Sequence, residues 1–220
     1  MRWDATRWNR ARLIELALAA AGLSGAIALN SWMGGVADRL GQRCAPSPDL
    51  LLSFLPRVDL RVLFVWGFAA FLVWAIAAGL LREGRRIAHI MWLYTLLIGL
   101  RSVFIVLTPM RSPVGALWVG GDPLFDAIGR HLTFHNDLFF SSHTACPYLG
   151  YLAYRDAWVR RVFLALSIVL AATVLLTRLH YSIDVFSAYF ITYALYRFER
   201  RKLRAPYRRL RMRLLGFLLR

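Results

Sequence analysis

Two clusters of polar residues, at positions 135–144 and 180–184, stand at the start of otherwise apolar runs. His180 and Asp184 are four residues apart, so on a helix they would share one face, with about 5–6 Å between their Cβ atoms. An aspartate placed in this way can hold one imidazole nitrogen and leave the other nitrogen free to attack. His143 in the first cluster supplies a second imidazole, which can protonate a leaving oxygen. His143, His180 and Asp184 are therefore the expected catalytic group.

Apolar helices are the elements that must position these residues. The chain is 59% hydrophobic, well above the roughly 45–50% of a soluble domain. Six apolar runs are each near the roughly 20 residues needed to cross a membrane. They are residues 13–29, 62–81, 87–107, 138–154, 162–177 and 180–198. We therefore expect an all-α polytopic membrane protein with six transmembrane helices in one bundle, a single catalytic domain over residues 1–220.

The basic residues are divided unequally between the two sides of this bundle. Twenty Lys and Arg residues fall on the side of the termini and seven on the other side, with Arg101 inside the third run. Because basic residues favour the cytoplasm, we expect both termini there, with a basic tail at 199–220, and the catalytic group at the outer, periplasmic or lumenal, face. This bias accounts for the net charge of +16, so no nucleic-acid partner is expected. A cleavable signal peptide is the alternative to a retained first helix.

Both clusters resemble the motifs of a known family, the sphingomyelin synthase group within the type 2 phosphatidic acid phosphatase superfamily. Residues 136–144 read Asn-Asp-Leu-Phe-Phe-Ser-Ser-His-Thr, which is similar to the family's Cys-Gly-Asp-Leu-x-Phe-Ser-Gly-His-Thr. Residues 180–185 read His-Tyr-Ser-Ile-Asp-Val, which is similar to its His-Tyr-Thr-Ile-Asp-Val. The resemblance implies that His180 is the nucleophile or base, that Asp184 orients it, and that His143 is the acid. It implies no metal or other cofactor, although two histidines and a carboxylate could also bind a metal.

The chain also departs from the superfamily pattern. Ser142 replaces a glycine and Asn136 a cysteine of the family motif, and Val174 stands where superfamily phosphatases use an arginine to hold phosphate. These differences speak against a simple phosphomonoesterase. Other groups must then neutralise a phosphate in a partly dry site.

Five residues are candidates for binding the substrate: Arg101, Arg178, Asp137, Ser142 and Tyr181. Arg101 lies inside an apolar run, where a paired or snorkelling structural arginine is the alternative. Arg178 could instead be a headgroup-level anchor. Asp137 could pair with an arginine or sit at a helix start. Backbone N–H groups near Ser142 would add donors for phosphate.

The expected activity is transfer of a phospho-head-group, such as phosphocholine or phosphoethanolamine, from a glycerophospholipid to a lipid hydroxyl such as that of ceramide or diacylglycerol. Hydrolysis, as by a phospholipase C or lipid phosphatase, uses the same residues and is the close alternative. A non-catalytic lipid-binding protein is the remote one. The expected partners are the lipid bilayer, a phospholipid donor and a lipid acceptor, and self-association as a homo-oligomer is compatible with the sequence.

Overall fold

The computed structural model describes residues 10–84 and 86–218, and within them every regular element is a helix. The expected all-α class is therefore confirmed. Some basic residues that enter the charge comparison, such as Arg2, Arg85 and Arg220, lie outside the described residues. The elements are α1 (Arg10–Gly41), α2 (Leu50–Phe54), η2 (Leu63–Gly67), α3 (Phe68–Arg82), α4 (Ile87–Leu107), α5 (Pro123–Ala127), η3 (Gly129–His131), α6 (Ser142–Ala153), α7 (Ala157–Leu176), α8 (Ser182–Phe198), η4 (Glu199–Leu203) and α9 (Arg204–Leu218).

Four helices in the described part of the chain are long and apolar enough to cross a membrane. They are α1, the continuous helix Leu63–Arg82 formed by η2 and α3, α4, and α7. The other two expected spans are shorter than the sequence predicted, because α6 has 12 residues and α8 has 17, against the roughly 20 of a full crossing. These lengths support a polytopic membrane protein, and the six-span arrangement stays a prediction.

Of the helix boundaries that differ from the expected ones, three have a local explanation. The first helix continues past residue 29 to Gly41, because the polar Asn30 stays helical and its side-chain oxygen accepts a hydrogen bond from Arg101 Nη1 at 3.0 Å. α6 begins at Ser142 rather than at residue 138, since the backbone before it bonds to Arg101 instead. α8 begins at Ser182, so the prediction that His180 lies on that helix is wrong.

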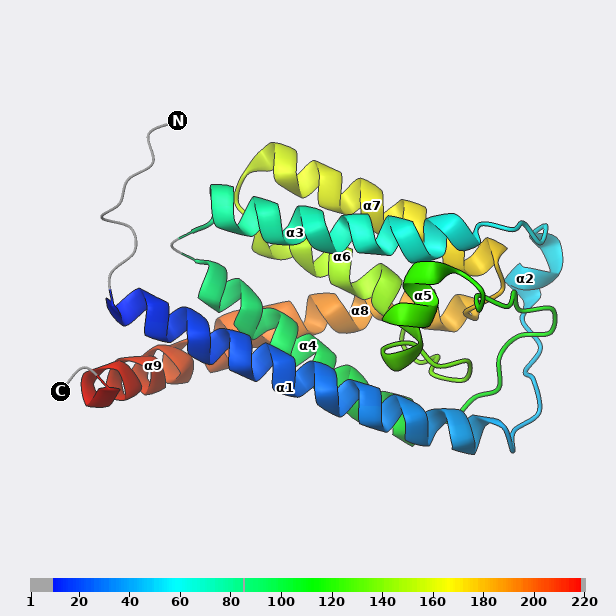
Figure 1. Cartoon of the computed structure of the whole chain (residues 1–220), viewed down its shortest axis with the longest axis horizontal. Helices are drawn as coiled ribbons and strands as arrows, with labels where there is room; N and C mark the ends of the chain where they lie inside the picture. Colours follow the sequence, from blue (N-terminus) through cyan, green and yellow to red (C-terminus); the bar gives the residue numbers. More distant parts are fainter. Residues whose placement is uncertain (1–9, 85, 219–220) are drawn as a thin grey trace.

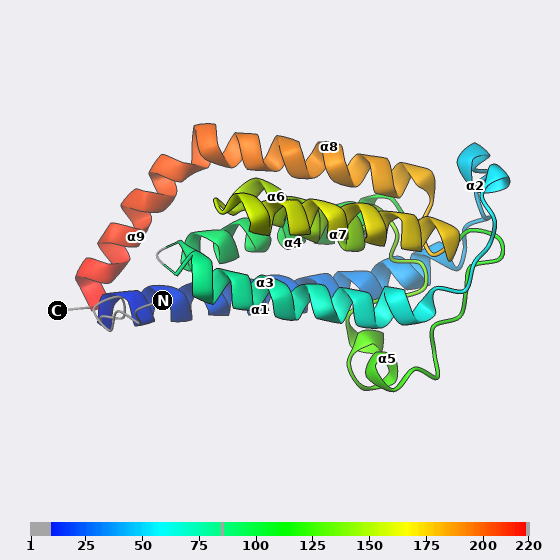
Figure 2. The ribbon, with the colours of Figure 1, turned by 90° about the horizontal axis from the view of Figure 1, so that it is seen from above.

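The helices lie side by side along the long axis of the molecule (Figure 1). α2, α5 and the long loops gather at one end, which we call the loop end (Figure 1). α1 begins and α9 ends at the opposite end, which we call the tail end (Figure 1). After the η4 turn, α9 leaves the line of α8 and crosses to the start of α1 (Figure 2). The basic tail is thus helical through Leu218.

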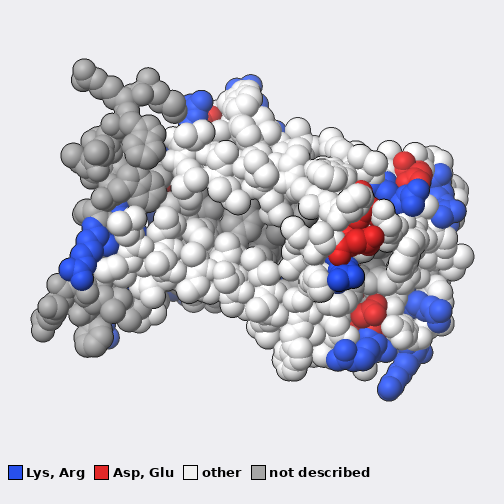
Figure 3. Space-filling view, viewed as in Figure 1, with Lys and Arg blue, Asp and Glu red and all other residues white. Residues whose placement is uncertain are grey.

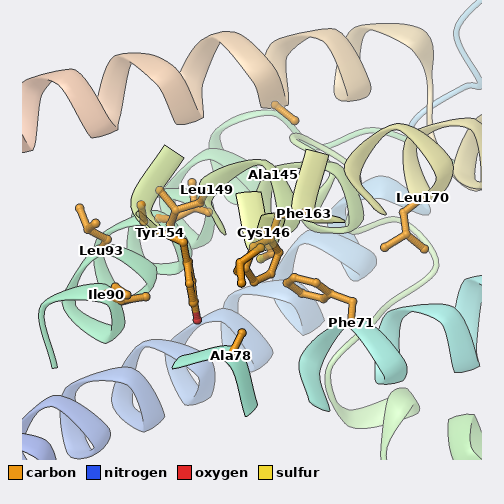
Figure 4. Close-up of a cluster of buried hydrophobic side chains, with 14 of the residues drawn as sticks. Phe71, Ala78, Ile90, Leu93, Ala145, Cys146, Leu149, Tyr154, Phe163 and Leu170 are labelled. Atoms are coloured by element: carbon orange, nitrogen blue, oxygen red, sulfur yellow. The ribbon is translucent and has the colours of Figure 1, made fainter. Parts of the chain in front are cut away.

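The core of the bundle is built from α3, α4, α6 and α7 (Figure 4). Phe71 and Phe163 are fully buried there, with ring centroids 6.0 Å apart. A Cβ atom at Gly150 would lie 2.7 Å from the Phe163 ring, so this glycine lets α6 pack closely on α7. Small residues at such helix contacts are typical of membrane bundles, where close packing replaces the hydrophobic effect.

Charged side chains lie toward the two ends of the molecule on the face shown in Figure 3, and the described surface between them is uncharged. Large apolar side chains are exposed along several helices, among them Val73 and Ile76 of α3 and Phe190 of α8. In a soluble protein an exposed apolar area of this extent would be a liability. A hydrocarbon layer around the middle of the bundle accounts for it.

Candidate active site

The two polar clusters meet at the loop end. The Ser141 amide donates a hydrogen bond of 3.1 Å to the Asp184 carbonyl, which joins the chain just before α6 to the first turn of α8. The two helices pack against each other beyond this bond. The clusters, 37 residues apart in the sequence, therefore form one site.

A sharp turn after α7 positions His180. α7 ends at Leu176, and Arg178 then takes a left-handed conformation with φ of 57°. The amides of Leu179 and His180 turn back to the Val174 carbonyl, at 3.0 and 3.2 Å. A left-handed arginine costs roughly 1–2 kcal/mol, and strained residues of this kind persist at functional sites when their surroundings hold them. The turn thus fixes the position of the backbone at His180.

Asp184 holds both the imidazole and the start of α8. Its Oδ2 atom lies 3.3 Å from His180 Nδ1 and accepts a hydrogen bond of 2.9 Å from the Tyr181 amide. The Asp184 side chain is fully buried, and His180 is 5% exposed. The pair therefore meets as expected, across a helix cap instead of along a helix face. With Nδ1 facing the carboxylate, Nε2 is the nitrogen left for chemistry.

His143 is held by aromatic rings of another helix. Its imidazole is stacked on Phe64, with ring centroids 4.1 Å apart and an interplanar angle of 18°. On Phe68 the centroid distance is 4.2 Å and the angle 36°. Only 4% of His143 is exposed. Neither phenylalanine was singled out in the sequence, because nothing near residues 64–68 indicates contact with position 143.

Arg101 is fully engaged with the protein. Its Nε donates to the Phe140 carbonyl at 2.8 Å, and its Nη2 lies 2.9 Å from Asp137 Oδ1. Its Nη1 donates to Asn30 Oδ1 at 3.0 Å and to Asp137 Oδ2 at 3.1 Å. The side chain is 5% exposed. Arg101 and Asp137 therefore form a buried ion pair that anchors the segment leading to His143.

Arg178 makes a different set of contacts. Its Nη1 donates to the Val114 carbonyl at 3.2 Å and its Nη2 to the Leu52 carbonyl at 3.4 Å. Both acceptors are neutral, and the residue is partly exposed. The guanidinium thus ties the turn before His180 to α2 and to the loop at residue 114, and its charge is not neutralised by these contacts. Of the two arginines, Arg101 has a carboxylate partner and Arg178 has none among the described residues.

The start of α6 offers hydrogen-bond donors beside His143. The first amides of a helix have no partner within it, and α6 begins at Ser142, a half-buried residue. Ser141 Oγ and Thr144 Oγ1 are buried and have no hydrogen-bond partner among the described residues. Buried hydroxyls usually find one. Together with the helix N-terminus, they form a cradle suited to phosphate oxygens. The sequence indicated Ser142, and the structure adds the hydroxyls of Ser141 and Thr144.

Tyr181, also expected to bind substrate, is turned toward the loops. Its hydroxyl donates to the Arg111 carbonyl at 2.8 Å and accepts from the Ser47 amide at 3.0 Å. The residue is 2% exposed. In this position Tyr181 joins the loops that contain Ser47 and Arg111 to the start of α8.

Asp49 is a site-supporting residue whose contact with α8 the sequence did not indicate. Its Oδ1 accepts from the Leu52 amide at 3.0 Å and its Oδ2 from the Ser182 amide at 2.6 Å. One carboxylate thus caps both α2 and α8. Partial burial favours the neutral acid, but the hydrogen bonds from Ser182 and Leu52 outweigh it and lower the pKa of Asp49. The proline-flanked position of Asp49 indicates the first cap, and nothing in the sequence indicates the second.

No group of three or more His, Cys, Asp or Glu side chains suited to a metal ion occurs within residues 10–84 and 86–218. The chemistry available from His143, His180 and Asp184 is proton transfer and nucleophilic attack beside a cradle for an anion.

The fold and site define an all-helical membrane protein with a buried histidine pair suited to phosphoryl chemistry. Residues 136–201 match the family described as PAP2 superfamily C-terminal. The match includes residues 136–144 of the first cluster and all of the second, and it supports the type 2 phosphatidic acid phosphatase superfamily, whose general activity is that of lipid phosphatases and phosphotransferases. No curated protein matches the chain.

Proposed function

We propose that this protein is a lipid phosphotransferase that moves a phospho-head-group from a glycerophospholipid to a lipid hydroxyl, in the manner of the sphingomyelin synthase group. The observation that carries the proposal is the hydrogen bond from Ser141 to Asp184. It draws the His143 cluster and the His180 cluster into one buried site, and the family match spans both clusters.

In the proposed reaction, His180 Nε2 attacks phosphorus, or takes the proton of the attacking hydroxyl, while Asp184 stabilises the imidazolium. The bond from phosphorus to the glycerol oxygen breaks, and His143 gives that oxygen a proton. Where His180 is the nucleophile, the acceptor hydroxyl then gives its proton to His143 as its oxygen bonds to phosphorus, and the bond from phosphorus to His180 Nε2 breaks. Where His180 is the base, the acceptor oxygen displaces the glycerol oxygen directly, and the proton that His180 has taken afterwards returns to His143. Preorganised donors stabilise the charge that develops on the phosphoryl oxygens. We assign this role to the start of α6 at Ser142 and to the free charge of Arg178.

Arg101, Asp137 and Tyr181 do not contact the substrate in this proposal. They support the binding site by holding the segments around it. The Arg101–Asp137 pair fixes the segment before α6, and Tyr181 joins two loops to the start of α8. A phosphate would have to displace Asp137 to reach Arg101, and removal of a buried partner is costly.

Transfer is favoured over hydrolysis by the surroundings of the histidines. Phe64 and Phe68 cover His143, and both catalytic histidines are at most 5% exposed. A site that excludes bulk water favours a lipid hydroxyl as the second nucleophile.

Purified protein with a head-group-labelled phospholipid tests the proposal directly. With diacylglycerol or ceramide present, the label is expected in a new lipid. If the label appears only as soluble phospho-head-group whatever acceptor is offered, the protein is a hydrolase.

We further propose that α6 and α8 complete a six-helix topology with both termini in the cytoplasm. Trp118 at the loop end and Met212 on α9 are 70% and 67% exposed, which suits them for labelling. In a Cys44→Ser, Cys146→Ser background, Trp118→Cys should react with a membrane-impermeant thiol reagent in intact cells. Met212→Cys should react only after permeabilisation. The reverse pattern would place the site in the cytoplasm.

A further inference from the structure

A cavity of about 150 Å³ lies at the tail end, between α1, α4 and α9. Its lining is largely apolar and includes Leu18 and Gly22 from α1, Trp92 from α4, and Tyr207 and Leu210 from α9. The catalytic group lies at the opposite end of the bundle, at the start of α6 and α8 (Figure 1). The cavity is therefore separate from the site already described.

Two buried donors of this lining have no acceptor. Arg211 Nε and Trp92 Nε1 are buried atoms without a hydrogen-bond partner in the described part of the chain, and both residues line the cavity. The rest of each side chain is held in place. Arg211 Nη2 lies 2.7 Å from the Glu15 carboxylate, and the Trp92 ring stacks on Tyr207 with centroids 5.2 Å apart. Buried donors are costly when unpaired, so a ligand with acceptor oxygens and an apolar part fits this cavity.

The positive charge of α9 indicates that the ligand is negatively charged. Five arginines lie on this helix, Arg204, Arg208, Arg209, Arg211 and Arg213, and it has no acidic residue. A basic helix at the end of a membrane bundle attracts anionic lipids of the adjacent leaflet. Glu15 is the single acidic residue in the lining of the cavity, and Arg211 already neutralises it.

We propose that this cavity binds one anionic phospholipid of the leaflet at the tail end. Its phosphate oxygens accept hydrogen bonds from Arg211 Nε and Trp92 Nε1, and the first part of an acyl chain lies against Leu18 and Gly22. The cavity is too small for a whole lipid, so the remainder of the chain extends into the bilayer. Such a lipid joins α9 to α1 and α4 and takes no part in the reaction at the loop end.

Lipid binding by the purified full-length chain in neutral detergent tests the proposal. The protein is titrated with phosphatidylglycerol or with phosphatidylcholine, and bound lipid is counted by native mass spectrometry. Phosphatidylglycerol should bind about tenfold more tightly, the effect of one charge-assisted hydrogen bond. Trp92→Phe keeps the ring on Tyr207 but removes the donor, and should weaken phosphatidylglycerol binding about tenfold. The matched control is Trp74→Phe, since Trp74 Nε1 is also buried without a partner but does not line the cavity.

A second pair of variants fills the cavity. A Cβ atom at Gly22 would have Thr95 as its nearest neighbour at 3.9 Å, and one at Gly25 would meet nothing within 4 Å. Gly22→Leu should abolish retention of phosphatidylglycerol, and Gly25→Leu, one turn along the same helix, should not. If Gly22→Leu does not fold, the tryptophan pair decides. Equal binding of the two lipids, or phosphatidylglycerol binding that survives both Trp92→Phe and Gly22→Leu, would overturn the proposal.

Discussion

The two histidines of the candidate site are held by different kinds of contact. His180 is fixed by hydrogen bonds to residues within six positions of it, Val174 on one side and Asp184 on the other. His143 is held between Phe64 and Phe68, which lie on a different helix and more than 70 residues earlier in the chain. Local polar contacts therefore determine the orientation of one histidine, and tertiary packing that of the other.

Removal of each imidazole should separate their roles most clearly. We expect His180→Ala to lower kcat by about four orders of magnitude or more, because the group that attacks phosphorus is lost. His143→Ala should lower kcat by about 10²–10⁴ with a natural phospholipid. The leaving group of p-nitrophenyl phosphocholine needs no proton. With this substrate the kcat of His143→Ala should return most of the way to the wild-type value, and the kcat of His180→Ala should stay low. Equal recovery by both variants would remove the distinction between nucleophile and acid.

Two buried aspartates provide the next test. Asp184→Asn can still accept the hydrogen bond from the Tyr181 amide but loses its charge, so kcat should fall by about 10³–10⁴ with little change in melting temperature. Asp137→Asn leaves Arg101 buried without its ion pair, and should lower the free energy of unfolding by about 3–5 kcal/mol. Kinetics and thermal melting of the same detergent samples distinguish the two effects. A large loss of stability in Asp184→Asn would instead make that residue chiefly structural.

Loosening the aromatic contact should affect His143 alone. Phe68→Leu removes one stacked ring, and we expect kcat to fall about tenfold with KM unchanged, since about 0.5–1.5 kcal/mol of aromatic contact is lost. Phe71→Leu on the same helix is the matched control, because the Phe71 ring contacts Phe68 and Phe163. It should lower stability without a selective loss of kcat. Similar kinetics for the two variants would show that packing at large, and not the orientation of His143, limits turnover.

The smallest expected effect concerns the cap that Asp49 forms on α2 and α8, and the dependence of its stabilising contribution on pH. The pKa of Asp49 is lower in the folded protein than its ordinary value, so its capping contribution is present above the unfolded pKa and is lost as the pH falls through the folded pKa. Asp49→Asn should lower stability by about 0.5–2 kcal/mol at neutral pH, and the difference from the wild type should shrink toward pH 3. Melting curves at several pH values measure it. A difference independent of pH would assign the effect to geometry and not to charge.

The contrast between local polar contacts and tertiary packing also explains how much of the site could be predicted from the sequence. The approach of the clusters around His143 and His180 followed from apolar runs that alternate in direction, and the meeting of His180 with Asp184 followed from their spacing. The helix boundaries were harder to predict from the sequence. Residues 138–141 stay outside α6 because of contacts with Arg101, which lies more than 35 positions away. The stacking of Phe64 on His143 and the second cap by Asp49 arise only in the folded bundle. Contacts of this kind leave no local pattern.

The ion pair between Glu15 and Arg211 joins residues 196 positions apart, and this separation bears on biogenesis. Chains are synthesised from the N-terminus at about 5–20 residues per second, so α9 emerges roughly 10–40 s after α1. During that interval Glu15 has been translated and its partner has not. The first helix of the bundle therefore reaches its final environment only after α9 has been made.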